Sequence, residues 1–147
     1  MQAYGFVWVG YEGGEPKEPV IKKYLFSDTE TITKGDLVTL DTTGTVGEID
    51  LAASGDTAII GVANETKAGT DSTTWMEVIL DLQGKGRYMV TDANARAEGT
   101  ELDIDGATGA MTLAADSDSD VIVAANSTAT EPTTVRIHPR AYGLGIT

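Results

Sequence analysis

The chain contains no cysteine and a single histidine in 147 residues. The absence of cysteine excludes disulfide bonds, thiolate metal sites and a cysteine nucleophile. One histidine is too few for a zinc site that is built on several imidazoles. No stretch approaches the roughly 18–20 consecutive apolar residues of a membrane-spanning helix, and the first residues lack the pattern of a signal peptide. We therefore expect no metal, no cofactor and no membrane partner.

Basic residues are also scarce. Ten Lys and Arg stand against 23 Asp and Glu, which gives a formal net charge of −13. Proteins that follow nucleic-acid phosphates bind them with Lys and Arg, so we expect no nucleic-acid partner. Hydrophobic residues make up 41% of the chain, too many for a disordered acidic tail. The length and composition predict one soluble domain with its own core.

Aromatic residues are only 6% of the chain, yet four of them, Tyr4, Phe6, Trp8 and Tyr11, lie in its first eleven residues. They alternate with glycine and valine, such as Val7, and this period of two predicts a strand. The strand could be an arm that adds to the sheet edge of another protein, with its aromatic side chains in apolar pockets. It could equally be a core strand of its own domain. The sequence leaves both interpretations open.

The segment Gly10–Pro19 separates this strand from the rest of the chain. It contains a glycine pair and two prolines, which interrupt helices and central strands and favour a loop. We therefore predict an N-terminal arm and linker over residues 1–23 and a single β domain over residues 24–147.

Short strands separated by turn residues dominate the predicted domain. The expected strands are Asp36–Asp41, Thr45–Ile49, Thr57–Ala63, Trp75–Leu82, Gly86–Val90, Glu101–Ile104, Ala110–Ala114, Val121–Ala125 and Thr134–Ile137. The one expected helical turn is Asp92–Ala97, with Asp92 as its N-cap. This pattern predicts an all-β fold, a barrel or sandwich with little helix.

The chain also resembles itself at an offset of about 60–64 residues. Gly35–Asp41 parallels Gly99–Asp105, and Ile59–Asn64 parallels Val121–Asn126. Two copies are too few for a solenoid. They favour one closed β unit made of two similar halves, with chance similarity of Thr- and Gly-rich hairpins as the alternative.

No motif in the chain predicts catalysis or a strong metal site. Asp116–Asp120 resembles the start of an EF-hand loop, but Val121 stands where that loop needs glycine and Ser127 where it needs glutamate. His138 has no Gly-x-Ser-x-Gly nucleophile motif to work with. Residues 97–135 contain acidic residues and no Lys or Arg, which is typical of a solvated face or of a surface that meets a basic partner. We expect no catalytic residues, so the chain is not predicted to be an enzyme.

Several short glycine-containing motifs give the chain a resemblance to a known family. They are Ile32–Val38, Ile60–Ala63 followed by Ala68-Gly69, and Gly99–Leu102 leading to Thr108-Gly109. With these motifs the chain resembles the tailed-phage head-decoration proteins, also called capsid cement proteins, over about residues 27–138.

The resemblance implies a small β-barrel or β-tulip domain that has no enzymatic activity. Such proteins bind the major capsid protein on the outer surface of the expanded shell, often as homotrimers at local three-fold axes, and stabilise it. In that case the capsid-binding arm would comprise Tyr4, Phe6, Val7, Trp8 and Tyr11. The alternative is a carbohydrate-binding β module on a virion surface or fibre tip, which would need an exposed aromatic platform.

Overall fold

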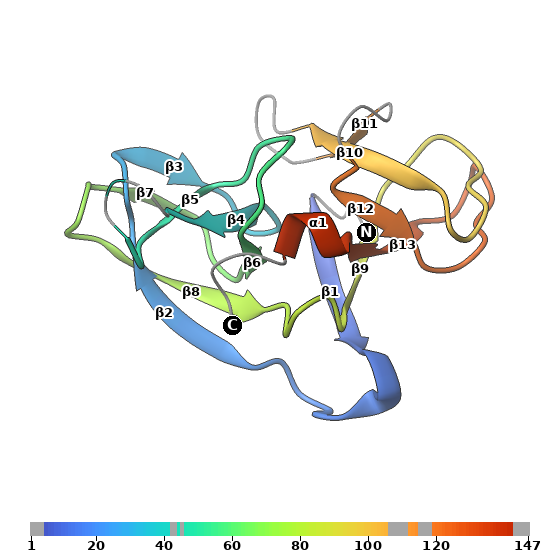
Figure 1. Cartoon of the computed structure of the whole chain (residues 1–147), viewed down its shortest axis with the longest axis horizontal. Helices are drawn as coiled ribbons and strands as arrows, with labels where there is room; N and C mark the ends of the chain where they lie inside the picture. Colours follow the sequence, from blue (N-terminus) through green and yellow to red (C-terminus); the bar gives the residue numbers. More distant parts are fainter. Residues whose placement is uncertain (1–4, 42–43, 45, 106–111, 115–118, 143–147) are drawn as a thin grey trace.

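The computed structural model describes residues 5–41, 44, 46–105, 112–114 and 119–142 (Figure 1). A six-stranded sheet has the order β1 (Phe6–Tyr11), β9 (Gly86–Val90), β13 (Thr133–Ile137), β12 (Val121–Val123), β10 (Glu101–Asp105), β11 (Thr112–Ala114). A five-stranded sheet has the order β2 (Ile21–Leu25), β8 (Trp75–Leu80), β6 (Ile59–Ala63), β4 (Leu37–Leu40), β5 (Ile49–Leu51). The strands β3 (Glu30–Ile32) and β7 (Lys67–Gly69) form a separate pair.

Helix is confined to two short elements in the described part of the chain. These are a 3-10 turn, η1 (Glu12–Gly14), and one turn of α-helix, α1 (Pro139–Tyr142). Among the described residues, no helix is long and apolar enough to cross a membrane. The prediction of an all-β fold with little helix is confirmed.

The two large sheets have the same internal order once β1 is set aside. The order β2-β8-β6-β4-β5 in one sheet corresponds to β9-β13-β12-β10-β11 in the other. The correspondence extends to single hydrogen bonds: Gly35 N donates to Ala63 O in the first half, and Gly99 N donates to Val123 O in the second. The predicted pair of similar halves is therefore confirmed, and each half builds one sheet (Figure 1). The predicted match of Ile59–Asn64 with Val121–Asn126 is wrong by two residues, because the strand registers make Ala63 equivalent to Val123 and not to Ala125.

A large apolar cluster holds the two sheets together. Leu37, Val62 and Ile79 from the five-stranded sheet belong to the same cluster as Tyr88 and Val135 from the six-stranded sheet. Their neighbours along the same strands, Val38, Ala63 and Val78, belong to a second cluster, as expected for strands whose two faces both pack against other elements. This cluster makes the two halves one core.

A smaller cluster lies on the other side of the five-stranded sheet. Six of its members are 0% exposed: Phe26, Ile32, Val38, Ile49, Met76 and Val78, of which Ile32 comes from β3. Phe26 follows β2 directly and forms a parallel bridge with Ile49 of β5, which brings the two edges of the sheet together. The five-stranded sheet thus approaches the small barrel that the sequence predicts.

The N-terminal strand belongs to the domain. β1 pairs with β9 from Phe6 opposite Val90 to Tyr11 opposite Gly86, with one irregularity between Trp8 and Gly10. The expectation of an arm separated from the domain is therefore wrong for Phe6–Tyr11, because burial of large aromatic side chains stabilises the strand in the sheet. The predicted boundary between residues 23 and 24 falls inside β2.

The predicted helical turn at Asp92–Ala97 is also wrong. The Asp92 carboxylate accepts hydrogen bonds from Asn94 N (3.2 Å) and Arg96 Nε (2.6 Å), so it closes a turn instead of capping a helix. Arg96 then forms an antiparallel bridge with Ser127. This backbone pairing takes the hydrogen bonds that a helix would need.

The connection between β8 and β9 carries the chain from one sheet to the other, although its Gly84-Lys85-Gly86 sequence suggests a simple hairpin. Asp81, only 1% exposed, accepts hydrogen bonds from Gly84 N and from the Tyr88 hydroxyl, the latter at 2.6 Å. Burial raises the pKa of Asp81 to about 6, despite these hydrogen bonds. The carboxylate fixes the bend between the two halves.

Candidate functional site

The residues predicted to bind a capsid are divided between the two faces of β1. Phe6 and Tyr11 are 1% and 5% exposed and point into the domain. Trp8 packs half-buried against the large cluster, with its ring 5.1 Å from that of Tyr11. Val7 is 41% exposed, and Tyr4 lies outside the described residues. Strand alternation, shifted by the irregularity between Trp8 and Gly10, therefore places the aromatic side chains on the core side and leaves Val7 on the surface.

The exposed side of β1 is an apolar strip at a sheet edge. Val7 and Val9 are 41% and 47% exposed, and β1 pairs within its sheet only with β9. Its first residue is tied down by a second contact, since Phe6 N donates to Gly35 O at 2.7 Å. An edge strand with exposed valines is suited to contact with another protein. Val9 lies outside the predicted capsid-binding arm, in which Val7 is the one non-aromatic residue.

An exposed aromatic ring lies at the start of β8. Trp75 is 52% exposed and pairs with Leu25 of β2 across the strands. Its carbonyl oxygen accepts a hydrogen bond of 2.7 Å from Lys67 Nζ. Among the described residues, Trp75 is the one aromatic side chain that is mostly exposed, so these residues do not form a broad aromatic platform.

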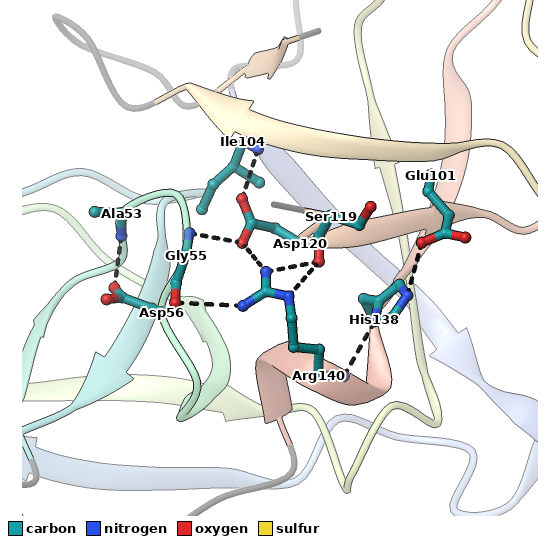
Figure 2. Close-up of polar contacts among 9 residues, drawn as sticks. All are labelled: Ala53, Gly55, Asp56, Glu101, Ile104, Ser119, Asp120, His138 and Arg140. Carbon is teal, nitrogen blue, oxygen red and sulfur yellow. Dashed lines mark hydrogen bonds and ion pairs between the residues drawn. The ribbon is translucent and has the colours of Figure 1, made fainter. Parts of the chain in front are cut away.

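An ion pair between a half-buried arginine and a buried aspartate of the second half also binds the backbone of Gly55 in the first half (Figure 2). Asp120, 0% exposed, accepts hydrogen bonds through Oδ1 from Arg140 Nη2 (2.8 Å) and Gly55 N (3.0 Å). Its Oδ2 accepts one from Ile104 N (3.1 Å). Arg140 also donates to Ser119 O at 2.7 Å. Asp120, expected from the sequence to lie in a solvated acidic loop, is thus a structural residue; Asp116 and Asp118 lie outside the described residues.

His138 is engaged on both sides of its ring. Nε2 lies 2.9 Å from Glu101 Oε1, and Nδ1 accepts a hydrogen bond of 3.1 Å from Arg140 N (Figure 2). These contacts anchor α1 to β10. They give the histidine a structural explanation that needs no substrate.

A groove of about 580 Å³ opens beside β2 and the end of β8. Tyr24, Leu40, Leu80 and other apolar side chains line it, and the ammonium groups of Lys22 and Lys85 lie at the same groove. Lys22 Nζ lies 5.1 Å from the centre of the Tyr24 ring, within cation–π range. The groove is therefore apolar with a basic margin, in a chain of net charge −13. No local pattern in the sequence predicts it, because its residues come from five separate segments.

Comparison with known proteins gives a likeness of fold. No family model and no curated protein matches the chain. The structure is similar to the crystal structure of the head fiber gp8.5 N base in bacteriophage phi29. The TM-score is 0.51 with 15% sequence identity, over 82% of this chain and 97% of that chain. At this identity the likeness establishes the fold alone.

Three carboxylates form an acidic cluster near β5. Asp28, Glu30 and Asp50 each have an oxygen within 4.8 Å of the others. Burial, followed by the neighbouring charges of Asp28 and Glu30, raises the pKa of Asp50 to about 7. Oxygen ligands at this spacing could hold a divalent cation. The expectation that the chain holds no metal remains a prediction.

The raised pKa of Asp50 predicts that the protein becomes more stable as the solution is made mildly acidic. The folded state binds this proton more tightly than the unfolded chain, so stability should rise as pH falls from about 8 to about 5. Asp50→Asn should raise the melting temperature at about pH 8 by roughly 2–4 °C and flatten the dependence. Thermal melts across this range measure both, with the exposed carboxylate variant Glu18→Gln as the control. An unchanged slope in Asp50→Asn would contradict the assignment.

Proposed function

We propose that this chain is a structural protein of a tailed-phage head. It binds the major capsid protein on the outer surface of the expanded shell, as homotrimers at local three-fold axes, and stabilises the shell. The observation that carries the proposal is the fold likeness to a phage head fiber base, over 97% of that chain. The glycine-containing motifs that resemble head-decoration proteins support it independently.

The composition and the side-chain contacts are consistent with this structural role. The chain has no cysteine, and its net charge of −13 keeps it soluble before assembly. His138 is held between Glu101 and Arg140, and Asp120 is held in the interior, so both have structural partners. We propose no enzymatic activity.

The capsid contact that we propose is the exposed side of β1. Its edge can accept a strand of the capsid protein, with main-chain hydrogen bonds setting the register. Val7 and Val9 then fill apolar positions on the partner, while Phe6, Trp8 and Tyr11 hold β1 in its own sheet. This assigns the contact to the valines and the support to the aromatic residues.

We expect the double variant Val7→Asp and Val9→Asp to bind expanded heads at least about tenfold more weakly than the unaltered chain. Loss of an apolar anchor costs at least about 1.4 kcal/mol, which is a tenfold change in affinity. Co-sedimentation with expanded heads of a phage that encodes the chain measures the affinity, and a thermal melt checks folding. Ile21→Asp, at another exposed apolar position, is the matched control. Full occupancy by the double variant would reject β1 as the contact, and absence of binding by the unaltered chain would reject the function.

A carbohydrate-binding module is the second candidate, favoured by the 52% exposure of Trp75. Sugar rings stack on exposed aromatic faces, so this candidate predicts that Trp75→Ala abolishes glycan binding. A glycan array with both proteins tests it. Under the capsid proposal Trp75→Ala decorates heads as well as the unaltered chain does.

A further inference from the structure

The two halves of the chain stack in a head-to-tail manner, because they meet through different faces. The strand registers make Val62 and Ile79 of the first half equivalent to Ile122 and Arg136 of the second. Val62 and Ile79 are buried in the large cluster between the sheets, whereas Ile122 and Arg136 lie on the other side of their sheet, half-buried. The first sheet therefore makes this contact with the face that carries Val62 and Ile79, which we call the outer face of a half. The second sheet makes it with the opposite face, which carries Tyr88 and Val135 and which we call the inner face.

The inner face of the second half has its counterpart at the groove. In the same registers the residues Tyr88, Val90, Ile104 and Ile137 correspond to Lys22, Tyr24, Leu40 and Leu80. The four residues of the second half are at most 3% exposed, in the cluster that joins the halves. Their four counterparts line the open groove. Val38 and Val78, the counterparts of Leu102 and Val135, are already buried in the smaller cluster. The groove is therefore the part of this face that remains open to another half.

A matching face remains uncovered at the other end of the stack. Glu101, Ile122 and Arg136 occupy the positions that Leu37, Val62 and Ile79 occupy in the first half. Glu101 is exposed and the other two are half-buried, while all three counterparts are buried. We call Glu101, Ile122 and Arg136, with the strands that carry them, the outer face of the second half.

We propose that the outer face of the second half in one copy of this chain packs over the groove of another copy. The contact repeats between chains the stacking that already joins the halves within one chain. It deepens the homotrimer of the proposed function, on which it rests, by naming the two surfaces that meet. A contact between two different surfaces is heterologous, and it closes into a ring when the rotation between copies allows.

The charges of the two surfaces favour the contact. The groove carries the ammonium groups of Lys22 and Lys85 against the single carboxylate of Glu15. The outer face of the second copy carries charges of both signs, Glu101, whose carboxylate also lies 2.9 Å from His138 Nε2, and Arg136. Glu101 can therefore meet the groove lysines, and Arg136 can meet the carboxylate of Glu15. Opposite charges at a partly apolar interface steer association and fix its register. This pairing also limits the repulsion between chains that each carry −13.

The proposed contact leaves β1 free for the capsid. In the contact between the two halves of one chain, the second half does not cover the outer face of β2, since Ile21 on that face is 46% exposed. By register Ile21 corresponds to Arg87 of β9. The strands that meet the groove are therefore β10, β12 and β13, and β1 lies beyond β9 at the edge of the sheet.

Sedimentation velocity without capsids tests the proposal, over micromolar to millimolar chain and at physiological salt. We expect the unaltered chain to associate with rising concentration. A groove variant, Lys22→Glu with Lys85→Glu, and a face variant, Glu101→Lys with Ile122→Lys, should each weaken self-association by about tenfold or more. The control Lys17→Glu with Lys34→Glu makes the same change of charge at exposed positions outside the groove and should associate like the unaltered chain. Circular dichroism confirms that each variant is folded before it is compared.

Mixing the two defective variants gives the sharpest outcome. Each retains one intact surface, the groove in the face variant and the face in the groove variant, so the mixture should form a 1:1 heterodimer that neither forms alone. A monomeric unaltered chain at every concentration, a groove variant that associates like the control, or a mixture without heterodimer would each overturn the proposal. Decoration of heads is measured separately. Self-association without decoration rejects only the function, and decoration by the groove variant at full occupancy rejects only this contact.

Discussion

Asp120→Ala is expected to lower the free energy of unfolding by about 3–5 kcal/mol, because it removes the acceptor of two backbone N–H groups and the buried partner of a half-buried arginine. The carboxylate is 0% exposed and accepts hydrogen bonds from Arg140, Gly55 N and Ile104 N. Its removal leaves two backbone N–H groups without their acceptor and takes the carboxylate partner from Arg140, which keeps its hydrogen bonds to Ser119 O and Gly55 O. The melting temperature should fall by about 10 °C or more. Because Gly55 belongs to the first half and Asp120 to the second, the loss also loosens the contact between halves.

Chemical denaturation measures this change, with two further variants for comparison. Arg140→Lys keeps the charge but loses the planar fork, so an intermediate loss is expected. Glu18→Ala removes an exposed carboxylate and should change stability by less than about 0.5 kcal/mol. An Asp120→Ala protein as stable as Glu18→Ala would contradict the assignment of Asp120 as a structural residue.

The second large effect is expected at Phe6. Phe6→Ala should cost about 3–5 kcal/mol, because the side chain is 1% exposed in the cluster that joins the sheets. Val7→Ala, the next position along β1, should cost less than about 1 kcal/mol, since Val7 is 41% exposed. The contrast between neighbours is the signature of a strand with one face in the core.

Equilibrium denaturation in urea, with the midpoints of the two variants compared at constant slope, measures the contrast. A free N-terminal arm predicts that neither substitution changes the midpoint. Equal midpoints for Phe6→Ala and the unaltered chain would therefore restore the arm and remove β1 from the core.

Much of the fold could be predicted from the sequence, because local patterns determine it. The alternating apolar residues of β4, β8 and β9 identify these strands, and the similarity of Gly35–Asp41 to Gly99–Asp105 predicts the two halves. β2 was missed because its Ile-Lys-Lys-Tyr-Leu sequence has the exposed charges of an edge strand and follows a loop rich in proline and glycine. At Asp92 the same residue type that caps helices also closes turns, so local sequence could not separate the two.

The surfaces were harder to predict, because long-range packing creates them. Nothing in the sequence indicates that Asp120 turns inward to meet Arg140, 20 residues further along the chain. The aromatic residues near the N-terminus drew attention to the right strand, but burial reverses their role, and Val7 and Val9 remain on the surface. The groove combines side chains from the N-terminal loop, β2, β4 and the end of β8, which no local pattern relates.

The central claim is that this chain decorates the outside of an expanded phage head. Cryo-electron microscopy of expanded heads incubated with the purified chain tests it most directly. We predict added density on the outer surface at local three-fold axes, into which three copies fit with β1 against the major capsid protein. Heads that carry no added density at saturating chain, or density only on the inner surface, would contradict the claim.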